Sequence, residues 1–321
     1  MRRRSAQSAA DVCAAVGVVS LAALLTIGCG RAPKRADPGS SAPRPAAAAG
    51  DPAAVGGAAG ARRIVSLVPA VTEMLFAIGA GPRVVAVSSF DTYPPEVRLL
   101  PTVGALIDPD LERIITLKPD LVVIDPGQVE LAGTLQKLGV STFPHGLGGL
   151  DHVTSTILQL GALTRMEERA RGLAGSIVAR LGQVRRHVEG RGRPRTLLVF
   201  GREPGTLRNI YASGGVGFLH DLVELAGGRN VFSAVRREAL QASTEAIIAA
   251  APEVIIELRY GASVVPGRLE AERDSWLALA SVPAVRDRRI YLLVGDELVV
   301  PGPRVAATAE RFAQALHPDA K

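Results

Sequence analysis

The sequence predicts an α/β fold of two lobes, each built on a parallel sheet and joined by a single long helix. Short apolar segments alternate with helix-period segments from residue 62 to residue 316, as in parallel sheets covered by helices. One segment pattern occurs twice, and a stretch of helical period with few helix breakers lies between the two copies. The chain has 321 residues, more than the roughly 100–200 of one domain, which also favours two lobes.

The first lobe is expected to alternate strands and helices. Its first strand, 64–68, stops at Pro69, and Thr72 is the expected cap of a helix that runs to Ile78 and ends at Gly79. The further elements are strand 84–87, a turn-rich loop at 88–95, helix 111–117, strand 121–124, helix 131–138, strand 140–143 and helix 150–163. This alternation implies a parallel sheet with helices on both faces.

The segment 166–188 is expected to form the connection between the lobes. A helix of this length would extend about 35 Å, enough to span a domain, so we interpret it as a rigid connector. The alternation then begins again. The elements expected in the second lobe are strand 196–200, helix 218–225, helix 245–250, strand 254–256, helix 275–280, strand 290–294 and helix 303–316.

A helix-to-strand segment occurs once in each half of the chain. Glu112 begins Glu-Arg-Ile-Ile and lies seven residues before Pro119, and Glu245 begins Glu-Ala-Ile-Ile and lies seven residues before Pro252. In both copies an acidic residue and an apolar strand follow the proline. A proline before a strand is common, but the shared spacing indicates two lobes of similar build.

The N-terminal segment, 1–61, has the composition of an export signal and a tether. Three arginines precede a short apolar run, 12–27, which is a poor transmembrane helix because such a helix needs about 20 apolar residues. The run ends at Leu-Thr-Ile-Gly-Cys, which resembles the lipobox of bacterial lipoproteins, with Thr26 where Leu is usual and Cys29 as the acylated residue. An ordinary cleaved signal and a retained anchor are the alternatives.

These features divide the chain into five parts. They are a signal peptide at 1–28, an unfolded tether at 29–61, an N-terminal lobe at 62–164, a connecting helix at 165–192 and a C-terminal lobe at 193–321. The tether consists mainly of Ala, Gly, Pro and Ser, which cannot bury enough apolar surface to fold. The signal, the lipobox and the tether predict a protein on the extracytoplasmic face, attached to the membrane by a lipid. We also expect a monomer.

Positive charge is concentrated before residue 62. The whole chain has a formal net charge of +6, of which residues 62–321 carry only +2, so a nucleic-acid surface is not expected. The only cysteines, Cys13 and Cys29, precede the expected lobes. Neither a disulfide nor a cysteine metal site is therefore expected in the folded part.

Motifs of common enzyme classes are missing from the sequence. It contains no Gly-x-x-x-x-Gly-Lys-Ser/Thr loop, no Gly-x-Gly-x-x-Gly after a strand, no Gly-x-Ser-x-Gly elbow and no His-Glu-x-x-His. The Gly-rich segment 213–217 lacks these spacings, and we interpret it as a loop where glycine allows close backbone approach. No catalytic residue and no resident cofactor or metal is expected.

Side chains suited to a ligand pocket follow the expected strands, at the edge where open α/β sheets bind ligands. They combine aromatic groups with a few polar ones, as small-molecule pockets do. The candidates are Phe90, Asp91, Asp125, His145, Phe200, Gly201, Arg202, Arg208, Tyr211, Arg259 and Tyr260. For any one of them the alternative is a core position, for an aromatic residue, or a solvated one, for an arginine.

The five histidines do not predict a metal site. No two of them are four residues apart, as a preformed zinc or manganese site on a helix would require. His145 differs from the others because it follows a strand and precedes Gly-Leu-Gly-Gly, so a ligand contact is a hypothesis for this residue alone. The other four are expected at core or surface positions.

Several segments resemble the family of helical-backbone periplasmic binding proteins for metal chelates. They are Arg63–Glu73, Val87–Glu96, Asp110–Ile114, Leu117–Val122, Leu225–Phe232 and Pro301–Arg304, and the similarity extends from about residue 62 to residue 316. The resemblance implies a substrate-binding protein of an ABC importer. Such a protein holds its ligand between two lobes and delivers it to a permease dimer with its ATPase.

The resemblance also implies a role for Glu112 and Glu245. By analogy, each inserts into an arginine pocket on one of the two permease subunits, which suits a receptor of two similar lobes that docks on a symmetric dimer. The alternative is a first-turn glutamate favoured by the helix dipole. Docking requires both glutamates to be exposed on the same side of the molecule.

Cobalamin or a related corrinoid is the first ligand that the resemblance implies. Phe90 and Phe200 match two cleft aromatics of cobalamin-binding members, whereas Ile107 stands near a position where such members have tryptophan, as Asp125 does near another. Heme and ferric siderophores are the alternatives within the family. A heme receptor would use an axial His or Tyr, and anionic groups of a chelate would suit arginines. The residues named for these roles are His145, Tyr211, Arg202, Arg208 and Arg259.

Two other classes of protein stay open. An exported α/β enzyme could share the sheet architecture, because a fold does not determine function, but it would need a nucleophile with a base, or a metal site. A tethered scaffold protein would show no saturable binding of a small molecule.

Overall fold

The computed structural model describes residues 60–261 and 267–319. The predicted signal peptide, Cys29 and nearly all of the predicted tether lie outside the described residues. Within these two ranges, no helix combines the length and the apolar composition needed to cross a membrane.

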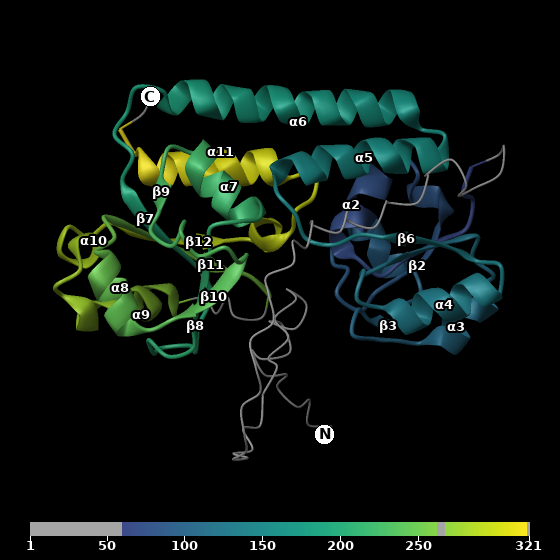
Figure 1. Ribbon diagram of the computed structural model, residues 1–321, viewed down its shortest axis with the longest axis horizontal. Coiled ribbons are helices and arrows are strands. Elements are labelled where there is room, and N and C mark those ends of the chain that lie inside the picture. Colours follow the sequence, from purple (N-terminus) through teal and green to yellow (C-terminus); the bar gives the residue numbers. More distant parts are fainter. Residues whose placement is uncertain (1–59, 262–266, 320–321) are drawn as a thin grey trace, which may run out of the picture.

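The main elements of the first half alternate between strand and helix, as predicted, and two short strands are added to them (Figure 1). They are β1 (Ile64–Ser66), α2 (Pro69–Ala77), β2 (Val84–Val87), β3 (Gly104–Ala105), β4 (Asp108–Pro109), α3 (Leu111–Thr116), β5 (Leu121–Ile124), α4 (Val129–Lys137), β6 (Ser141–Pro144), α5 (Leu150–Thr164) and α6 (Glu167–Val188). The added strands are β3 and β4, between β2 and α3. Short 3₁₀ turns lie at 81–83 and 95–99.

The second half adds strands that the sequence did not predict. Its elements are β7 (Arg195–Gly201), β8 (Ile210–Ser213), α7 (Phe218–Leu225), β9 (Arg229–Asn230), β10 (Ala239–Ala242), α8 (Thr244–Ala250), β11 (Val254–Arg259), α9 (Leu269–Asp274), α10 (Pro283–Arg286), β12 (Ile290–Val294) and α11 (Val305–Leu316). Residues 275–279, expected within an independent helix, form a 3₁₀ turn that continues α9.

Helix α2 begins before its expected cap. Pro69 lies in the first turn, where a missing N–H costs nothing. Thr72, expected at the cap, is inside the helix, and its hydroxyl donates to Ser66 Oγ at 2.8 Å. This contact ties α2 to the end of β1.

The sheet of the first lobe is parallel throughout. Its strand order is β2-β1-β5-β6, and helices cover both faces. Leu121 and Val123 of β5 belong to the core on the side of α2 and α5, whereas Val122 faces Ile114 of α3 and Leu135 of α4. Burial on both faces explains why these strands are continuous apolar runs.

The sheet of the second lobe combines a parallel centre with an antiparallel edge. Its order is β10-β8-β7-β11-β12, in which β7, β11 and β12 are parallel and β8 and β10 are antiparallel. The parallel strands were predicted. Strands β8 and β10 were not, because Ile-Tyr-Ala-Ser and Ala-Leu-Gln-Ala are too short and too mixed to show a strand period.

The Gly-rich segment 213–217 packs against a neighbouring stretch of backbone. A Cβ on Gly214 would lie 2.0 Å from the carbonyl oxygen of Arg237, and one on Gly215 would lie 1.9 Å from that of Ser233. The close approach expected for this segment is therefore present, and only glycine permits it.

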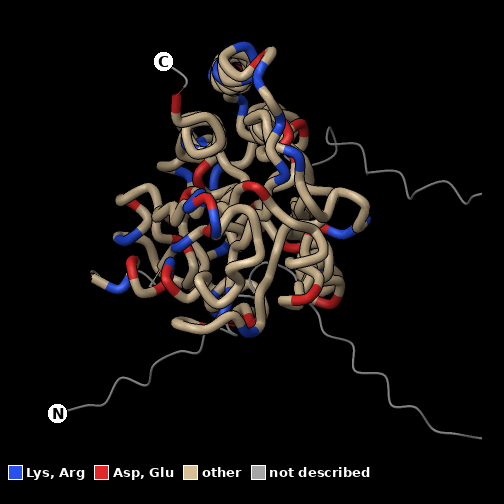
Figure 2. The backbone as a smooth tube through the Cα atoms, turned by 90° about the vertical axis from the view of Figure 1, so that its left-hand side faces the viewer, with Lys and Arg blue, Asp and Glu red and all other residues tan. Residues whose placement is uncertain are grey.

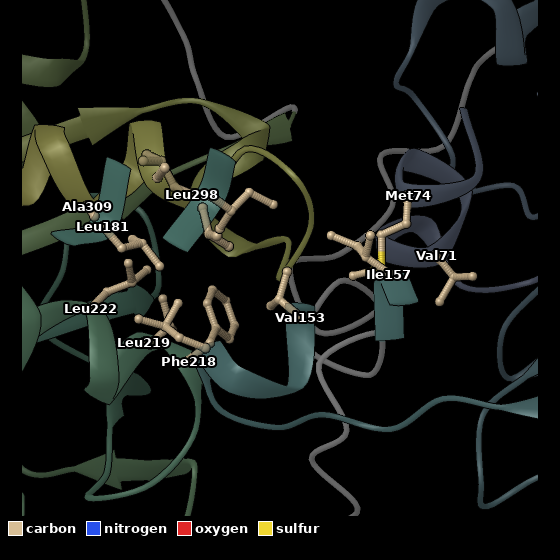
Figure 3. Close-up of a cluster of buried hydrophobic side chains, with 14 of the residues drawn as sticks. Val71, Met74, Val153, Ile157, Leu181, Phe218, Leu219, Leu222, Leu298 and Ala309 are labelled. Carbon is tan, nitrogen blue, oxygen red and sulfur yellow. The ribbon is translucent and has the colours of Figure 1, made fainter. Parts of the chain in front are cut away.

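One helical layer covers both sheets. Helix α6, predicted as the long connector, runs along α5 and α11 on one side of the molecule (Figure 1). Side chains from α2, α5, α6, α7 and α11 form a continuous buried cluster, in which Met74, Ile157, Leu222 and Ala309 have no exposed surface (Figure 3). Because the lobes share this core, we expect them to move little relative to each other.

The sequence repeat corresponds to a structural repeat, because the acidic residue after each repeated proline makes the same contact. The Asp120 carboxylate accepts a hydrogen bond from the backbone N–H of Arg62 at 2.8 Å, and the Glu253 carboxylate accepts one from that of Arg195 at 2.7 Å. Each acidic residue thus joins the start of one strand to the first strand of its own lobe.

Charges of both signs are interspersed along the described backbone (Figure 2). This distribution agrees with the low net charge of residues 62–321.

Candidate functional site

The loop after β2 places two of the predicted ligand residues, Phe90 and Asp91, at the carboxyl edge of the first sheet. Asp91 Oδ2 accepts hydrogen bonds from the Ser88 backbone N–H at 2.9 Å and the Ser88 hydroxyl at 2.6 Å. Burial raises the pKa of Asp91 to about 6, although the hydrogen bonds oppose the shift. Its other oxygen, Oδ1, has no hydrogen-bond partner among the described residues. Phe90 beside it is half-buried.

An ion pair between the lobes lies next to this loop. Arg304, at the start of α11, donates from Nε to Glu73 Oε2 of α2 at 2.9 Å and from Nη2 to Oε1. The side chain of Glu73 is 4% exposed and that of Arg304 is 25% exposed. Burial raises the pKa of Glu73 against the opposing effect of Arg304, and the charge of Asp91 raises it further. Glu73 therefore depends on the second lobe for its counter-ion.

Two more residues complete this interlobe cluster. The guanidinium carbon of Arg304 lies 4.0 Å from the centre of the Tyr93 ring, a cation–π contact that positions an exposed aromatic ring at the boundary. Glu297 Oε2 lies 3.7 Å from Arg304 Nη1, and Glu297 Oε1 lies 2.7 Å from Arg311 Nη1. The boundary between the lobes is thus polar and charged beside an aromatic surface.

A second contact between the lobes lies at the start of α5. The backbone N–H of Leu150 donates to Asp221 Oδ2 of α7 at 2.9 Å. A Cβ on Gly149 would lie 2.4 Å from that oxygen, so a larger residue there would displace the Asp221 carboxylate. The carboxylate of one lobe therefore caps a helix of the other, as an anion at a helix N-terminus does.

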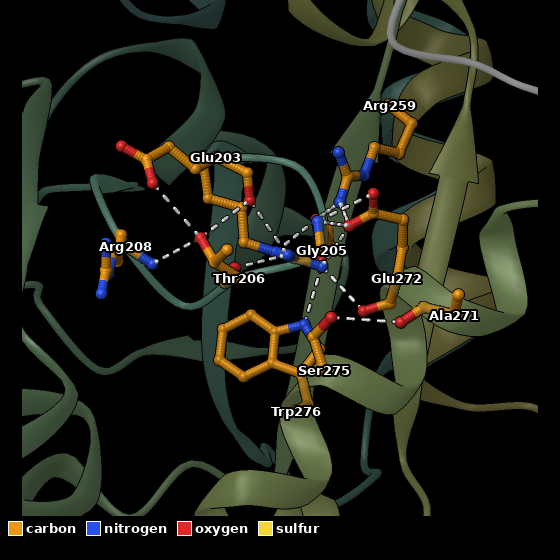
Figure 4. Close-up of polar contacts among 11 residues, drawn as sticks. Glu203, Gly205, Thr206, Arg208, Arg259, Ala271, Glu272, Ser275 and Trp276 are labelled. Carbon is orange, nitrogen blue, oxygen red and sulfur yellow. Dashed lines mark hydrogen bonds and ion pairs between the residues drawn. The ribbon is translucent and has the colours of Figure 1, made fainter.

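Two predicted ligand residues, Arg202 and Arg259, do not face the boundary between the lobes. Their side chains are 0% and 5% exposed and pair with Glu257 and Glu272, with Arg202 Nε at 2.9 Å from Glu257 Oε1. Figure 4 shows the pairing of Arg259 with Glu272. Trp276 Nε1 donates to Glu257 Oε2 at 2.8 Å. The expectation that these arginines bind an anionic ligand is wrong for this structure, because two carboxylates already neutralise them inside the second lobe.

Phe200, expected at the pocket, is a core residue. Its side chain is 2% exposed within β7, and its ring centre lies 6.5 Å from that of the half-buried Tyr211. Gly201 ends the strand and is paired with Tyr211 of β8. The alternative stated for the aromatic candidates therefore applies to Phe200.

His145 is also an internal residue. It is 5% exposed, stacks on His152 with ring centres 4.9 Å apart and lies 3.4 Å from the Thr156 hydroxyl. Burial, and then His152, lower the pKa of His145 to about 4. In this conformation His145 cannot be an axial ligand of heme. Within the described residues, no three His, Cys, Asp or Glu side chains form a group that could hold a metal ion.

The remaining candidates occupy loops around the edges of the sheets. Asp125 accepts from the Gly127 N–H at 2.7 Å and so stabilises the turn after β5. Ile107 is 65% exposed at the tip of the β3–β4 hairpin. Arg208 is exposed and Tyr260 is half-buried after β11. Ligand contact stays a prediction for Asp125, Ile107, Arg208 and Tyr260.

Glu112 and Glu245 occupy the same place in the two lobes. Each is the second residue of a helix, after a cap in which Asp110 accepts from Arg113 N–H and Ser243 accepts from Ala246 N–H. Both glutamates are exposed, and α3 and α8 both lie on the side of the molecule away from α6 (Figure 1). Hydrogen bonds at the helix start, first its own backbone N–H and then Ser243, lower the pKa of Glu245.

The interlobe cluster of Glu73, Tyr93, Glu297 and Arg304 was not predicted from the sequence. A signal was available for Glu73, because it lies among apolar residues on a helix whose neighbours are all buried. A carboxylate in such a position needs a buried cation. The sequence could not say which arginine supplies it.

Comparison with known proteins identifies relatives across most of the chain. The family model described as periplasmic binding protein matches residues 64–296. A vitamin B12-binding protein from Salmonella typhimurium is 29% identical over 258 residues, which cover 80% of this chain and 90% of that protein. The uncharacterized ABC transporter substrate-binding lipoprotein YvrC from Bacillus subtilis is 27% identical over 263 residues, 80% of this chain and 81% of that protein.

Solved structures of periplasmic binding proteins also match this chain over most of its length. The periplasmic heme-binding protein RhuT from Roseiflexus is 28% identical with a TM-score of 0.67, covering 82% of this chain and 100% of that one. The periplasmic vitamin B12-binding protein BtuF of Vibrio cholerae is 26% identical with a TM-score of 0.68, covering 80% and 97%.

Proposed function

The chain belongs to the periplasmic binding protein family, and from this premise we propose that it captures a corrinoid outside the inner membrane and delivers it to a permease. The relatives named above are solute-binding proteins and not enzymes. The chain is accordingly an extracytoplasmic substrate-binding protein of an ABC importer for vitamin B12, heme or a siderophore.

The observation that carries the receptor role is the matched position of Glu112 and Glu245. Two exposed carboxylates, each in the first turn of a capped helix and one in each lobe, suit a partner with two equivalent basic pockets. A depression of about 340 Å³ beside α3 includes Glu112 in its lining. Complementary charge of this kind mainly sets orientation and association rate.

Ligand would be held at the boundary between the lobes, near the loops that carry Phe90 and Tyr93. The shared core beneath both sheets limits lobe movement, so capture would involve modest closure and not wide hinge bending. Aromatic faces there would contact a flat macrocycle, and polar groups would bind its side chains.

Corrinoid is preferred over heme for two reasons. Seven curated relatives, each matching about 80% of the chain, are described as vitamin B12-binding proteins. In addition, His145, one of the two axial candidates for heme, is buried against His152. Heme is the second candidate because heme-binding proteins share the fold, and Tyr211 of β8, the other axial candidate, is only half-buried.

Calorimetric titration of the full chain with cyanocobalamin, hemin and ferrichrome tests the ligand. We expect saturable 1:1 binding of cyanocobalamin, at least about 100-fold tighter than either other chelate, a difference of roughly 3 kcal/mol. Tighter binding of hemin would replace the corrinoid proposal with a heme receptor. Binding of none of the three would contradict the proposed ligand class.

Removing the two carboxylates tests docking. Glu112→Ala with Glu245→Ala should abolish ligand uptake and permease association while the affinity for ligand stays unchanged, because neither residue contacts the lobe boundary. Glu130→Ala with Glu270→Ala is the matched control, since these are also exposed second residues of helices. If ligand affinity collapsed in the first pair, or transport failed equally in the control pair, the docking role would be wrong.

We also propose that the chain is held at the membrane through Cys29. The Leu-Thr-Ile-Gly-Cys segment and the following Pro-rich tether support this. Labelling of cells with radioactive palmitate should mark the protein, and Cys29→Ser should remove the label. Persistence of the label in the variant would exclude Cys29 as the site.

A further inference from the structure

Each docking glutamate is accompanied by an exposed isoleucine three residues later. Ile115 is 40% exposed and Ile248 is 43% exposed, and the spacing between them along the chain is the same as that between Glu112 and Glu245. Among the eleven large apolar side chains that are exposed in the described residues, they are the only pair with this separation. Single exposed apolar residues are normal on protein surfaces. Ile115 and Ile248 differ from these because they occupy equivalent positions of the repeat.

The neighbouring residues show how the helices are oriented. Ile114 and Ile247, one position earlier, have no exposed surface and anchor α3 and α8 to separate cores. Ile114 and Ile247 are the only buried residues of α3 and α8, whereas the isoleucine that follows each of them is exposed.

Residues three apart on a helix are neighbours on its surface. Each helix thus presents a carboxylate beside an apolar side chain, Glu112 with Ile115 and Glu245 with Ile248. A carboxylate that binds a cation is held more strongly when adjoining apolar groups exclude water, because the local dielectric constant falls.

We propose that Ile115 and Ile248 form, with the two glutamates, a pair of equivalent acidic and apolar contacts for a two-fold symmetric partner. This inference rests on the proposed docking function and adds the chemistry of the partner: each of its two subunits presents a basic group beside an apolar surface. The two isoleucines become buried only in the complex.

Binding of the full chain to its permease and ATPase complex, held in lipid nanodiscs, tests the proposal. Ile115→Ser with Ile248→Ser should weaken the complex by about fivefold to tenfold for each site, the effect of losing the burial of part of an isoleucine side chain, without changing ligand affinity or the melting temperature. Leu138→Ser with Leu277→Ser, at residues that are 53% and 59% exposed, is the matched control and should leave the affinity unchanged.

The outcomes separate this inference from the docking role itself. If the isoleucine variant binds normally while Glu112→Ala with Glu245→Ala does not, the apolar contact is refuted and the docking role stands. If both variants bind normally, both are refuted.

A spectroscopic readout avoids reliance on affinity alone. Bimane attached to Ile115→Cys or Ile248→Cys, in a chain with Cys13 and Cys29 changed to Ser, should shift to shorter wavelength when the permease complex is added. A label at Leu138→Cys should not shift. An unchanged spectrum at both isoleucine positions would overturn the proposal.

Discussion

Two buried clusters of glutamate and arginine in this protein differ in where the arginine comes from. In the second lobe, Glu257 is paired with Arg202 and Arg259, which lie in the same lobe. At the boundary, Glu73 of the first lobe is paired with Arg304 of the second, 231 residues away. The first cluster is complete within one lobe, whereas the second exists only when both lobes are in place.

The same physical requirement, a cation for a buried carboxylate, has different consequences in the two clusters. A buried carboxylate costs several kcal/mol unless a cation and hydrogen bonds compensate it. Inside a lobe, this requirement joins β7, β11 and α9 to one another. Across the boundary, it makes the ionised state of one lobe depend on the position of the other, so substitutions in the two clusters should have different effects.

The largest effect is expected inside the second lobe. Arg202→Ala should lower the free energy of unfolding by about 3–5 kcal/mol, because it leaves two buried carboxylates with one guanidinium. Trp276, the single tryptophan, donates to Glu257, so its fluorescence during urea unfolding reports on this cluster. Arg208→Ala, at an exposed residue of the same loop as Arg202, should change the free energy by less than about 0.5 kcal/mol. A loss below about 1 kcal/mol for Arg202→Ala would show that the cluster contributes little.

A smaller loss of stability, accompanied by a change in lobe position, is expected at the boundary. Arg304→Ala should lower the free energy of unfolding by about 1–3 kcal/mol, because Glu73 stays buried without its partner. The distance distribution between spin labels at Lys137→Cys and Arg273→Cys, both exposed, should broaden. Pulsed electron paramagnetic resonance measures this distribution in a chain whose two native cysteines are changed to Ser.

The matched control is an ion pair on the surface of the same helical layer. Arg180 of α6 binds Glu310 of α11 at 2.9 Å, with both side chains nearly half exposed. Arg180→Ala should cost no more than about 0.5 kcal/mol and leave the distances unchanged. An unaltered distribution in Arg304→Ala would mean that the interlobe pair does not hold the lobes in position.

An effect that depends on pH is expected at the loop beside the boundary. Burial raises the pKa of Asp91 from 3.8 to about 6, so the folded protein keeps a proton that the unfolded chain has already released. The free energy of unfolding therefore falls as pH rises from about 4 to about 6, and stays lower above that range.

Asp91→Asn removes this proton equilibrium. It should raise the free energy of unfolding at pH 7 by up to about 3 kcal/mol relative to the wild type, the equivalent of the pKa shift from 3.8 to about 6, and change it little at pH 4. Thermal unfolding of both proteins between pH 4 and pH 8 checks this. Parallel curves over the whole range would show that Asp91 does not bind a proton with the raised pKa.

The candidate site was predictable only in part, and particular residues show why. Glu112 and Glu245 were found because a repeat is visible in one dimension, and the structure has both exposed at equivalent positions. The positions of Arg202 and Arg259 after strands suggested a pocket. Their partner Glu272 lies on α9, outside the strands, and nothing in its spacing indicates the contact.

The sequence by itself determined the alternation of strands and helices, the long helix α6 and the division into two similar halves. These follow from the period of apolar residues and from punctuation by Gly and Pro, which are local properties of the chain. Only the tertiary structure decided that β8 and β10 join the second sheet antiparallel, that Arg202 and Arg259 are internal, and that Arg304 neutralises Glu73. Each of these three features depends on contacts between segments that are far apart in the sequence. The stabilisation from pairing a buried charge or a strand edge is gained only when those segments are in contact, so it cannot be seen in the local sequence.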